Sequence, residues 1–225
     1  FFTGAGLEAA IRPGNVHFPV TKLVVLENTH NRGGGSVWPL DRIDEVAGVA
    51  RSHGLALHLD GARLWHATAA TGIPEREYVS RFDSVSVCFS KGLGAPVGSA
   101  LAGSKAFIAR ARRFRKQFGG GMRQAGIIAA GALYALKNHR ERLPENHANA
   151  RRFAEGIAGL PGIEFDPATV ETNIVIFRVT NRPAPEFVGM LREAGLAVNA
   201  TAPDTVRAVA HLDVSMAEEI GRAHV

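Results

Sequence analysis

Cysteine is almost absent from this sequence. Cys88 is the only one among 225 residues, and a single cysteine cannot form an intrachain disulfide. Nothing therefore indicates an oxidising compartment. Cys88 lies in an apolar run without a basic neighbour that would activate its thiol, so we interpret it as a core residue and not as a nucleophile.

Long apolar runs and a signal peptide are absent as well. No run approaches the roughly 20 apolar residues that cross a bilayer, and the N-terminus has neither a basic start nor a cleavage motif. We therefore expect a cytoplasmic protein without a membrane partner. The chain begins at Phe1 and not at methionine, so we also expect that its natural start is missing.

Charge and histidine spacing exclude two further classes of protein. The net charge is +5, but the basic residues are spread along the chain except for the run 110–116, which helical spacing distributes over more than one face. That run favours a solvated or subunit-facing helix, and we expect no nucleic-acid partner. The nine histidines show no zinc spacing, so we predict no metal site.

The hydrophobic pattern alternates between strands and helices, which favours an α/β fold with a mostly parallel sheet. A helix is predicted over Pro39–His53, where apolar residues recur at helical spacing until Gly54. In this half of the chain we expect strands at 23–26, 55–59, 84–89 and 97–102. They are apolar nearly throughout, which is typical of a parallel sheet covered on both faces.

The second half is first helical and then returns to strands. Residues 104–160 are mostly helical, with breaks at Gly119–Gly121 and at Pro144. Further strands are expected at 163–165, 173–179, 197–199 and 206–212, with a helix at 184–194. The pattern predicts a large domain at 1–140 and a smaller C-terminal α/β domain at 141–218. Residues 219–225 resemble a translated sequencing adapter, so we expect a non-native tail there.

Charged side chains follow two of the expected strands. Asp60 and Arg63 come directly after strand 55–59, and Lys91 follows strand 84–89. The carboxyl ends of parallel strands meet at one rim, where open α/β sheets bind ligands, so these residues should converge. Together they suit pyridoxal phosphate (PLP), which needs a lysine for a Schiff base, a carboxylate for its ring nitrogen and cations for its phosphate.

Each of these residues also has a plainer interpretation. Lys91 suits a solvated loop, Asp60 suits an Asx-turn that opens a loop, and Arg63 suits a surface ion pair. The stretch Gly92–Gly98 superficially resembles a dinucleotide-binding loop. Its spacing is wrong, however, and Pro96 falls where such a loop should enter a helix.

Longer motifs carry a resemblance to a known family. They are LENTHN at 26–31 followed by three glycines, HLDGAR at 58–63, SVCFSKGLGAPVGS at 86–99 and FGGGMRQAG at 118–126. In this order they resemble the low-specificity L-threonine aldolases, PLP enzymes of the β-eliminating lyase group with an aspartate-aminotransferase-like fold. The resemblance runs from about Leu7 to about Met216.

The resemblance implies roles for the three strand-end residues and for three more. By it, Lys91 is the Schiff-base lysine, Asp60 pairs with the ring nitrogen, and Arg63 helps to bind the phosphate. The further residues are Arg123, which reaches the phosphate from a neighbouring subunit, Arg207, which holds the substrate carboxylate, and His17, which lines the pocket near the β-hydroxyl. Without the resemblance, Arg207 suits an exposed edge of a strand and His17 suits a packed histidine.

The implied activity is cleavage of L-threonine, L-allo-threonine and related β-hydroxy-α-amino acids to glycine and an aldehyde. The resemblance also implies a homodimer or homotetramer with shared active sites. Two alternatives stay open: another PLP-dependent β-eliminating lyase, and an inactive fragment. The fragment is an alternative because the family's phosphate-binding glycine and threonine and its ring-stacking histidine precede Leu7 and have no counterpart here.

Overall fold

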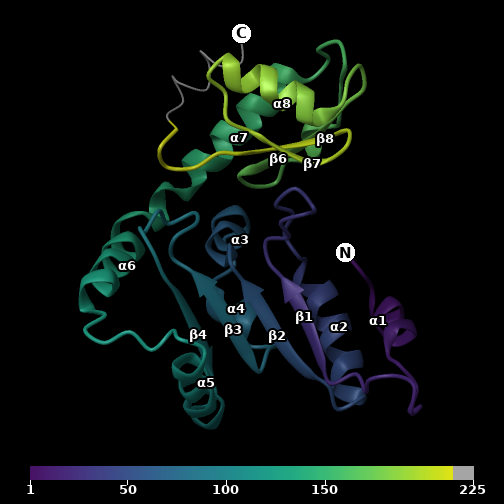
Figure 1. The fold of residues 1–225 in the computed structure, drawn as a ribbon. Coiled ribbons are helices and arrows are strands. Elements are labelled where there is room, and N and C mark those ends of the chain that lie inside the picture. The colour runs from purple at the N-terminus through teal and green to yellow at the C-terminus, as the bar shows by residue number, and fades with distance from the viewer. Residues whose placement is uncertain (215–225) are drawn as a thin grey trace.

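The computed structural model describes residues 1–214. The non-native tail expected at 219–225 lies outside these residues, as does the end of the domain expected at 141–218. The described chain forms two four-stranded sheets, which we call the first and the second sheet in chain order (Figure 1). None of the helices in residues 1–214 combines the length and the apolar character that crossing a bilayer requires.

The first sheet is mostly parallel, as the hydrophobic pattern predicts. Its strands in order are β1 (Leu23–Glu27), β2 (Ala56–Gly61), β3 (Ser84–Cys88) and β4 (Ser99–Gly103). The first three run parallel, whereas β4 pairs antiparallel with β3. The segment 89–98 is too short for the crossover of about a dozen residues that a parallel pair needs, so the chain turns straight back.

Four helices accompany this part of the chain, and the sequence pattern predicts one of them. They are α1 (Gly4–Ala10), α2 (Leu40–Ser52), α3 (Leu64–Thr71) and α4 (Glu75–Val79). The predicted helix is α2, with Ile43, Val46 and Ala50 on its buried face and Gly54 in the left-handed region (φ 64°) beyond its end. The other three are too short to show a helical period in the sequence.

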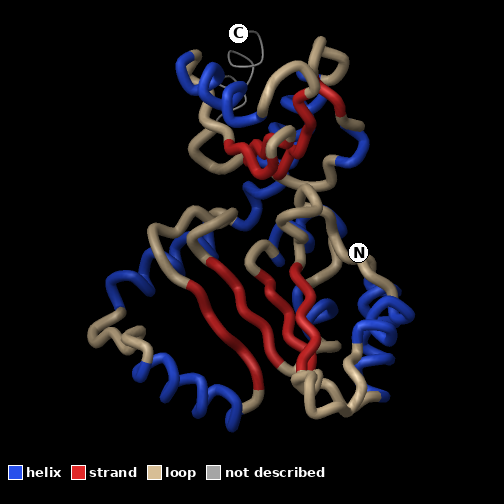
Figure 2. Tube along the Cα trace, turned by 45° about the vertical axis from the view of Figure 1, so that its right-hand side comes forward, coloured by secondary structure: helices blue, strands red, loops and turns tan. Residues whose placement is uncertain are grey.

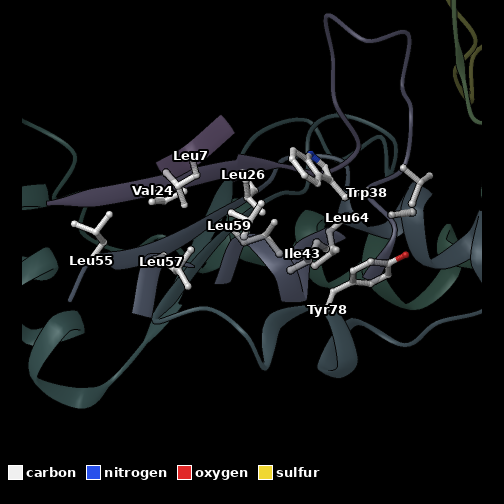
Figure 3. Close-up of a cluster of buried hydrophobic side chains, with 14 residues drawn as sticks. Leu7, Val24, Leu26, Trp38, Ile43, Leu55, Leu57, Leu59, Leu64 and Tyr78 are labelled. Atoms are coloured by element: carbon white, nitrogen blue, oxygen red, sulfur yellow. The ribbon is translucent and has the colours of Figure 1, made fainter. Parts of the chain in front are cut away.

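One face of the first sheet carries the main hydrophobic core (Figure 3). Its most buried side chains come from two strands and three helices, and each is at most 1% exposed: Leu26, Leu57, Leu59, Ile43, Leu64 and Tyr78. This cluster fixes β2 and the start of α3 to each other. Because Asp60 lies in β2 and Arg63 immediately precedes α3, this packing determines the positions of both residues.

The opposite face of the first sheet is open, which corrects the expectation that both faces are covered. Leu23 and Val25 of β1 are 52% and 48% exposed, and every residue of β4 is exposed. Cys88 is half-buried on this face and is not a core residue. The signal for one buried face is present in β3, where serine and valine alternate with the two-residue period of a half-buried strand.

The helical segment predicted at 104–160 is confirmed. It contains α5 (Lys105–Gln117), α6 (Gly126–Asn138), the 3-10 turn η1 (Arg140–Arg142) and α7 (Leu143–Ile157). Gly119–Gly121 separate α5 from α6, and Pro144 lies in the first turn of α7. No residue of α5 is buried, which agrees with a solvated or subunit-facing helix for the basic run 110–116.

The second sheet is antiparallel throughout. Its strands in order are β5 (Ile163–Glu164), β6 (Ile174–Val179), β8 (Thr205–Val209) and β7 (Asn199–Ala202), and η2 (Pro167–Thr169) and α8 (Ala184–Glu193) complete this part. It has a hydrophobic core of its own, to which α7 contributes Phe153, β6 contributes Phe177 and β8 contributes Val206.

Two strands of the second sheet depart most from their predicted bounds, and the strand expected at 206–212 spans 205–209, as β8. The strand expected at 197–199 starts two residues later, as β7. The reason is the hairpin that β7 forms with β8, in which Ala202 lies opposite Thr205 and only Pro203 and Asp204 connect them. Pairing with β8, and not local apolar character, sets where β7 begins.

The carboxyl ends of β1, β2 and β3 point toward the second sheet (Figure 1), and α7 leads from one part to the other (Figure 2). The loop after β1 also reaches the second sheet: Thr172 donates a hydrogen bond from Oγ1 to the Gly35 carbonyl oxygen at 2.6 Å, and the Val37 amide donates to Oε2 of Glu171 at 2.9 Å. The division into domains between residues 140 and 141 stays a prediction.

We expect Leu59→Ala to lower the free energy of unfolding by about 2–5 kcal/mol, because it leaves a cavity in the main core. Leu59 is 0% exposed, whereas Leu23 on the neighbouring strand is 52% exposed. The matched control Leu23→Ala should cost less than about 1 kcal/mol. Urea unfolding measures both, and equal losses would contradict the placement of the core.

Candidate functional site

Two of the predicted site residues lie at the carboxyl edge of the first sheet. Asp60 is the penultimate residue of β2, in register between Glu27 of β1 and Ser86 of β3. Lys91 follows three residues after the end of β3. Because these strands run parallel, Asp60 and Lys91 emerge at the edge that faces the second sheet (Figure 1).

The Asp60 carboxylate is fixed by its own loop. Its Oδ1 accepts a hydrogen bond from the Ala62 amide at 3.0 Å, which confirms the Asx-turn interpretation. This bond uses one of the two carboxylate oxygens, and the residue is half-buried. An Asx-turn and a ligand contact are therefore compatible for this side chain.

Lys91 sits on a tight turn. The Gly94 amide donates to the Lys91 carbonyl oxygen at 2.9 Å, and the φ of 66° at Gly94 favours glycine. Lys91 is exposed, which agrees with the loop interpretation and leaves its amine accessible to a ligand. The turn leads into β4 and not into a helix, so Gly92–Gly98 is not a dinucleotide-binding loop.

Arg63 lies immediately before α3 and is half-buried, so it is not the exposed partner of a surface ion pair. Burial lowers the pKa of its guanidinium below the ordinary value, and the nearby charge of Arg207 lowers it further. Glu27 and Asp60 oppose the shift in this pKa. Two arginines and two carboxylates are therefore close enough at this edge to influence one another.

Arg207 lies on β8, an inner strand of the second sheet, which corrects the interpretation as an edge residue. Its Nη1 donates to Oδ1 of Asn31 at 3.1 Å, in the loop after β1. Its Nε is buried and has no hydrogen-bond partner among residues 1–214. Arg207 and Asn31 line a cavity of about 370 Å³ together with Arg32, Ile176, Thr201 and Thr205.

The structure does not bring the other two predicted residues to this edge. His17 is exposed in the loop that enters β1, at the amino end of that strand. Arg123 is exposed in the segment between α5 and α6. Their roles stay predictions.

His58 is a site neighbour that the strand-end motifs did not single out. It shares a face of β2 with Asp60, and its Nδ1 lies 2.8 Å from Oγ of Ser84 on β3. Burial lowers the pKa of His58, and the charge of Asp60 opposes this. The available signal was strand alternation, which places positions 58 and 60 on one face.

A pair of histidines, one buried and one half-buried, also lies beside the site. Nδ1 of His66 on α3 is 2.9 Å from Nε2 of His147 on α7, and His66 is 1% exposed. Burial lowers the pKa of His66 to about 3, with smaller contributions from His147 and Arg63. Burial and the charge of Arg151 lower the pKa of His147 to about 4. No sequence signal could join two residues 81 positions apart.

Solved structures with the same arrangement define the class of fold. Threonine aldolase of Leishmania major superimposes with a TM-score of 0.80 at 18% identity, over 99% of this chain and 66% of that chain. A structure of SPT with PLP superimposes with a TM-score of 0.68 at 19% identity, over 99% of this chain and 57% of that chain. The fold is thus the α/β fold of PLP-dependent aldolases and transferases.

The chain belongs to the beta-eliminating lyase family, whose model matches residues 1–180. This family is PLP-dependent. The chain is similar to low-specificity L-threonine aldolase 1 of Arabidopsis thaliana, at 40% identity over 217 residues, covering 94% of this chain and 61% of that protein. It is 43% identical over 205 residues to the low specificity L-threonine aldolase of Escherichia coli K12, covering 91% of this chain and 59% of that protein. The chain spans about three fifths of the length of these curated relatives.

The residues at the edge fit PLP in their chemistry. Lys91 offers an accessible amine, Asp60 a fixed carboxylate and Arg63 a half-buried cation. The unpartnered Nε of Arg207 is a further sign, because a buried donor without a partner costs free energy that an anionic ligand would offset.

The histidine pair should make the protein sensitive to acid. Both rings have folded-state pKa values, about 3 and about 4, below the ordinary 6.5, so the folded state binds fewer protons than the unfolded state. Their contribution to stability is therefore complete above pH 6.5 and is lost as the pH falls from 6.5 toward 4, by at most about 1.4 kcal/mol per pH unit for each ring.

Urea unfolding at a series of pH values tests this expectation. The double variant His66→Asn, His147→Asn should flatten the fall in stability over this range, because neither asparagine can be protonated. His53→Asn removes an exposed histidine that lies 2.8 Å from Glu8 and is the control. An unchanged slope in the double variant would show that the pair does not cause the acid sensitivity.

Proposed function

We propose that the protein acts as a PLP-dependent aldolase, which cleaves L-threonine, L-allo-threonine and related β-hydroxy-α-amino acids to glycine and an aldehyde. The observation that carries the proposal is that Arg207 of the second sheet bonds to Asn31 in the loop after β1, close enough to Arg63 for the two charges to interact. This arrangement suits two separate anionic groups, which a cofactor phosphate and a substrate carboxylate provide.

Three residues at the carboxyl edge of the first sheet hold the cofactor. The amine of Lys91 binds it covalently, Asp60 keeps a proton on its ring nitrogen, and Arg63 binds its phosphate. When bound, PLP accepts the electron pair that is released as the Cα–Cβ bond breaks. The Asx-turn supports the role of Asp60, because the bond to the Ala62 amide holds the carboxylate in one orientation.

Arg207 binds the substrate carboxylate. Asn31 occupies its Nη1, while the buried Nε lacks a partner among the described residues. A planar guanidinium can offer two parallel donors to a carboxylate, which fixes the orientation of the substrate as well as its affinity. The cavity of about 370 Å³ beside it is in the size range of small-molecule sites.

The remaining two residues complete the proposal. His17 is proposed to act near the β-hydroxyl of the substrate, but its place at the amino end of β1 gives this role no support. Arg123 adds positive charge to the phosphate site of a neighbouring subunit, in a homodimer or homotetramer. The exposure of Arg123 between α5 and α6 supports this role, because it leaves the guanidinium free to reach another subunit.

The family itself suggests one alternative, a β-eliminating lyase that acts on another amino acid. The products separate the two functions. An aldolase releases glycine and an aldehyde, whereas a β-eliminating lyase releases ammonia and a 2-oxo acid, which is pyruvate from serine and 2-oxobutanoate from threonine. Incubation with threonine and with serine, followed by product analysis, decides between them.

We expect Lys91→Ala to abolish the visible absorbance band that forms when the protein is mixed with PLP, because no other residue is proposed to bind the cofactor covalently. Lys105→Ala, which removes an exposed lysine at the start of α5, is the matched control and should keep the band. Spectrophotometric titration measures both. A band of full strength in Lys91→Ala would rule out this role for Lys91.

Arg207→Lys should raise the KM for threonine roughly tenfold to a hundredfold, because an ammonium cannot form the paired, charge-assisted hydrogen bonds of a guanidinium. PLP binding should change little. Arg178→Lys is the control, since Arg178 on the neighbouring strand is exposed and bonded to Asp204. Steady-state kinetics provide the measurement, and a KM equal to that of the control would remove Arg207 from the substrate site.

A further inference from the structure

The turn that carries Lys91 packs directly against a histidine. A methyl group added to Gly92 would overlap Nε2 of His66 and would lie 2.9 Å from its Cδ2. Gly92 does not have a positive φ, so its backbone conformation does not require glycine. The imidazole of His66 thus occupies the space that a Cβ atom at position 92 would need.

His66 is held in place from the other side. Its ring lies 5.1 Å from that of His147, measured between centroids, and the two nitrogens that face each other share one hydrogen. The backbone amide of His66 donates to the Arg63 carbonyl oxygen at 2.9 Å. His66, which lies on α3, therefore contacts both the Lys91 turn and α7 through its ring.

The hydrogen between the two rings has a preferred position. If it belongs to His147, Nε2 of His66 must carry its own hydrogen toward Gly92, where residues 1–214 offer no acceptor. If it belongs to Nδ1 of His66, the lone pair of Nε2 faces Gly92 and can accept a weak Cα–H contact. The second arrangement avoids an unpaired donor. Burial lowers the pKa of both rings, so each ring is neutral in either arrangement.

The residue after Gly92 is anchored too. Leu93 is 1% exposed in a cluster with Trp65, and its carbonyl oxygen accepts a hydrogen bond from Nδ1 of His139 at 2.6 Å. The turn is therefore fixed at two successive residues, and exposed Lys91 immediately precedes them. The direction of the lysine side chain depends on where Gly92 rests.

We propose that His66, supported by His147, is a positioning residue for Lys91: the edge of its imidazole is the surface on which Gly92 packs, and it sets where the lysine amine enters the cofactor site. This inference rests on the proposed role of Lys91 as the cofactor lysine. Neither histidine touches the reacting atoms in this proposal.

A double-mutant cycle between Gly92→Ala and His66→Ala tests the contact in the full protein. In the wild-type background, Gly92→Ala should speed hydrogen exchange of the Gly94 and Ala95 amides at least about tenfold without cofactor, and should weaken PLP binding about tenfold. In the His66→Ala background the added methyl has space, so Gly92→Ala should change either quantity by less than about twofold.

Two further variants keep the cycle interpretable. Gly48→Ala adds a methyl on α2 where nothing lies within 4 Å, and should leave exchange and PLP binding unchanged. If His66→Ala does not fold, His66→Gln takes its place, because a glutamine can still bond to His147 and leaves room beside Gly92. Thermal melting of the cofactor-free protein establishes that each variant is folded.

Borohydride trapping of PLP on the wild-type protein, followed by peptide mass analysis, separates this inference from the proposed function. Absence of trapped cofactor at Lys91 would overturn both. Trapping at Lys91 with equal effects of Gly92→Ala in both backgrounds would overturn only the positioning role of His66. Trapping at Lys91, together with rescue of amide exchange and PLP binding in the double variant, is the expected result.

Discussion

The site depends on two positively charged residues, Arg63 and Arg207, which lie close enough for their charges to interact. Arg63 reaches it from the start of α3 and Arg207 from β8, and the charge of Arg207 contributes to lowering the pKa of Arg63. Partly buried like charges are unfavourable unless negative groups compensate them. Glu27 and Asp60 compensate in part. The remaining positive charge suits this edge to an anionic ligand.

Neither arginine could hold its position without the packing behind it. Arg63 immediately precedes Leu64, which is buried in the main core, and Arg207 follows Val206, which is buried in the core of the second sheet. Each cation is therefore attached to a different rigid body. The loop after β1 connects the two bodies through the hydrogen bond between Asn31 and Arg207. The two arginines are thus positioned by two separate hydrophobic cores.

Local pattern was sufficient for much of this arrangement. Parallel strands of known direction place their carboxyl ends together, so Asp60 and Lys91 could be assigned to one edge from the sequence. The antiparallel direction of β4 follows from the short turn before it, and the start of β7 follows from its pairing with β8. Apolar character in the sequence predicted neither the direction of β4 nor the start of β7. The contact of His66 with Gly92 was beyond prediction, because it requires knowing how α3 lies against a turn that follows another strand.

The bond between Asn31 and Arg207 spans 176 residues of sequence, and this has a consequence for the order in which the protein is made. The first sheet has all of its strands long before the ribosome reaches β8, and a nascent domain folds as a unit once it has emerged. The growing chain would therefore contain the folded turn with Lys91 and the folded loop with Asp60 before Arg207 is translated. If these residues have the proposed roles, the cofactor site would form during synthesis before the substrate site.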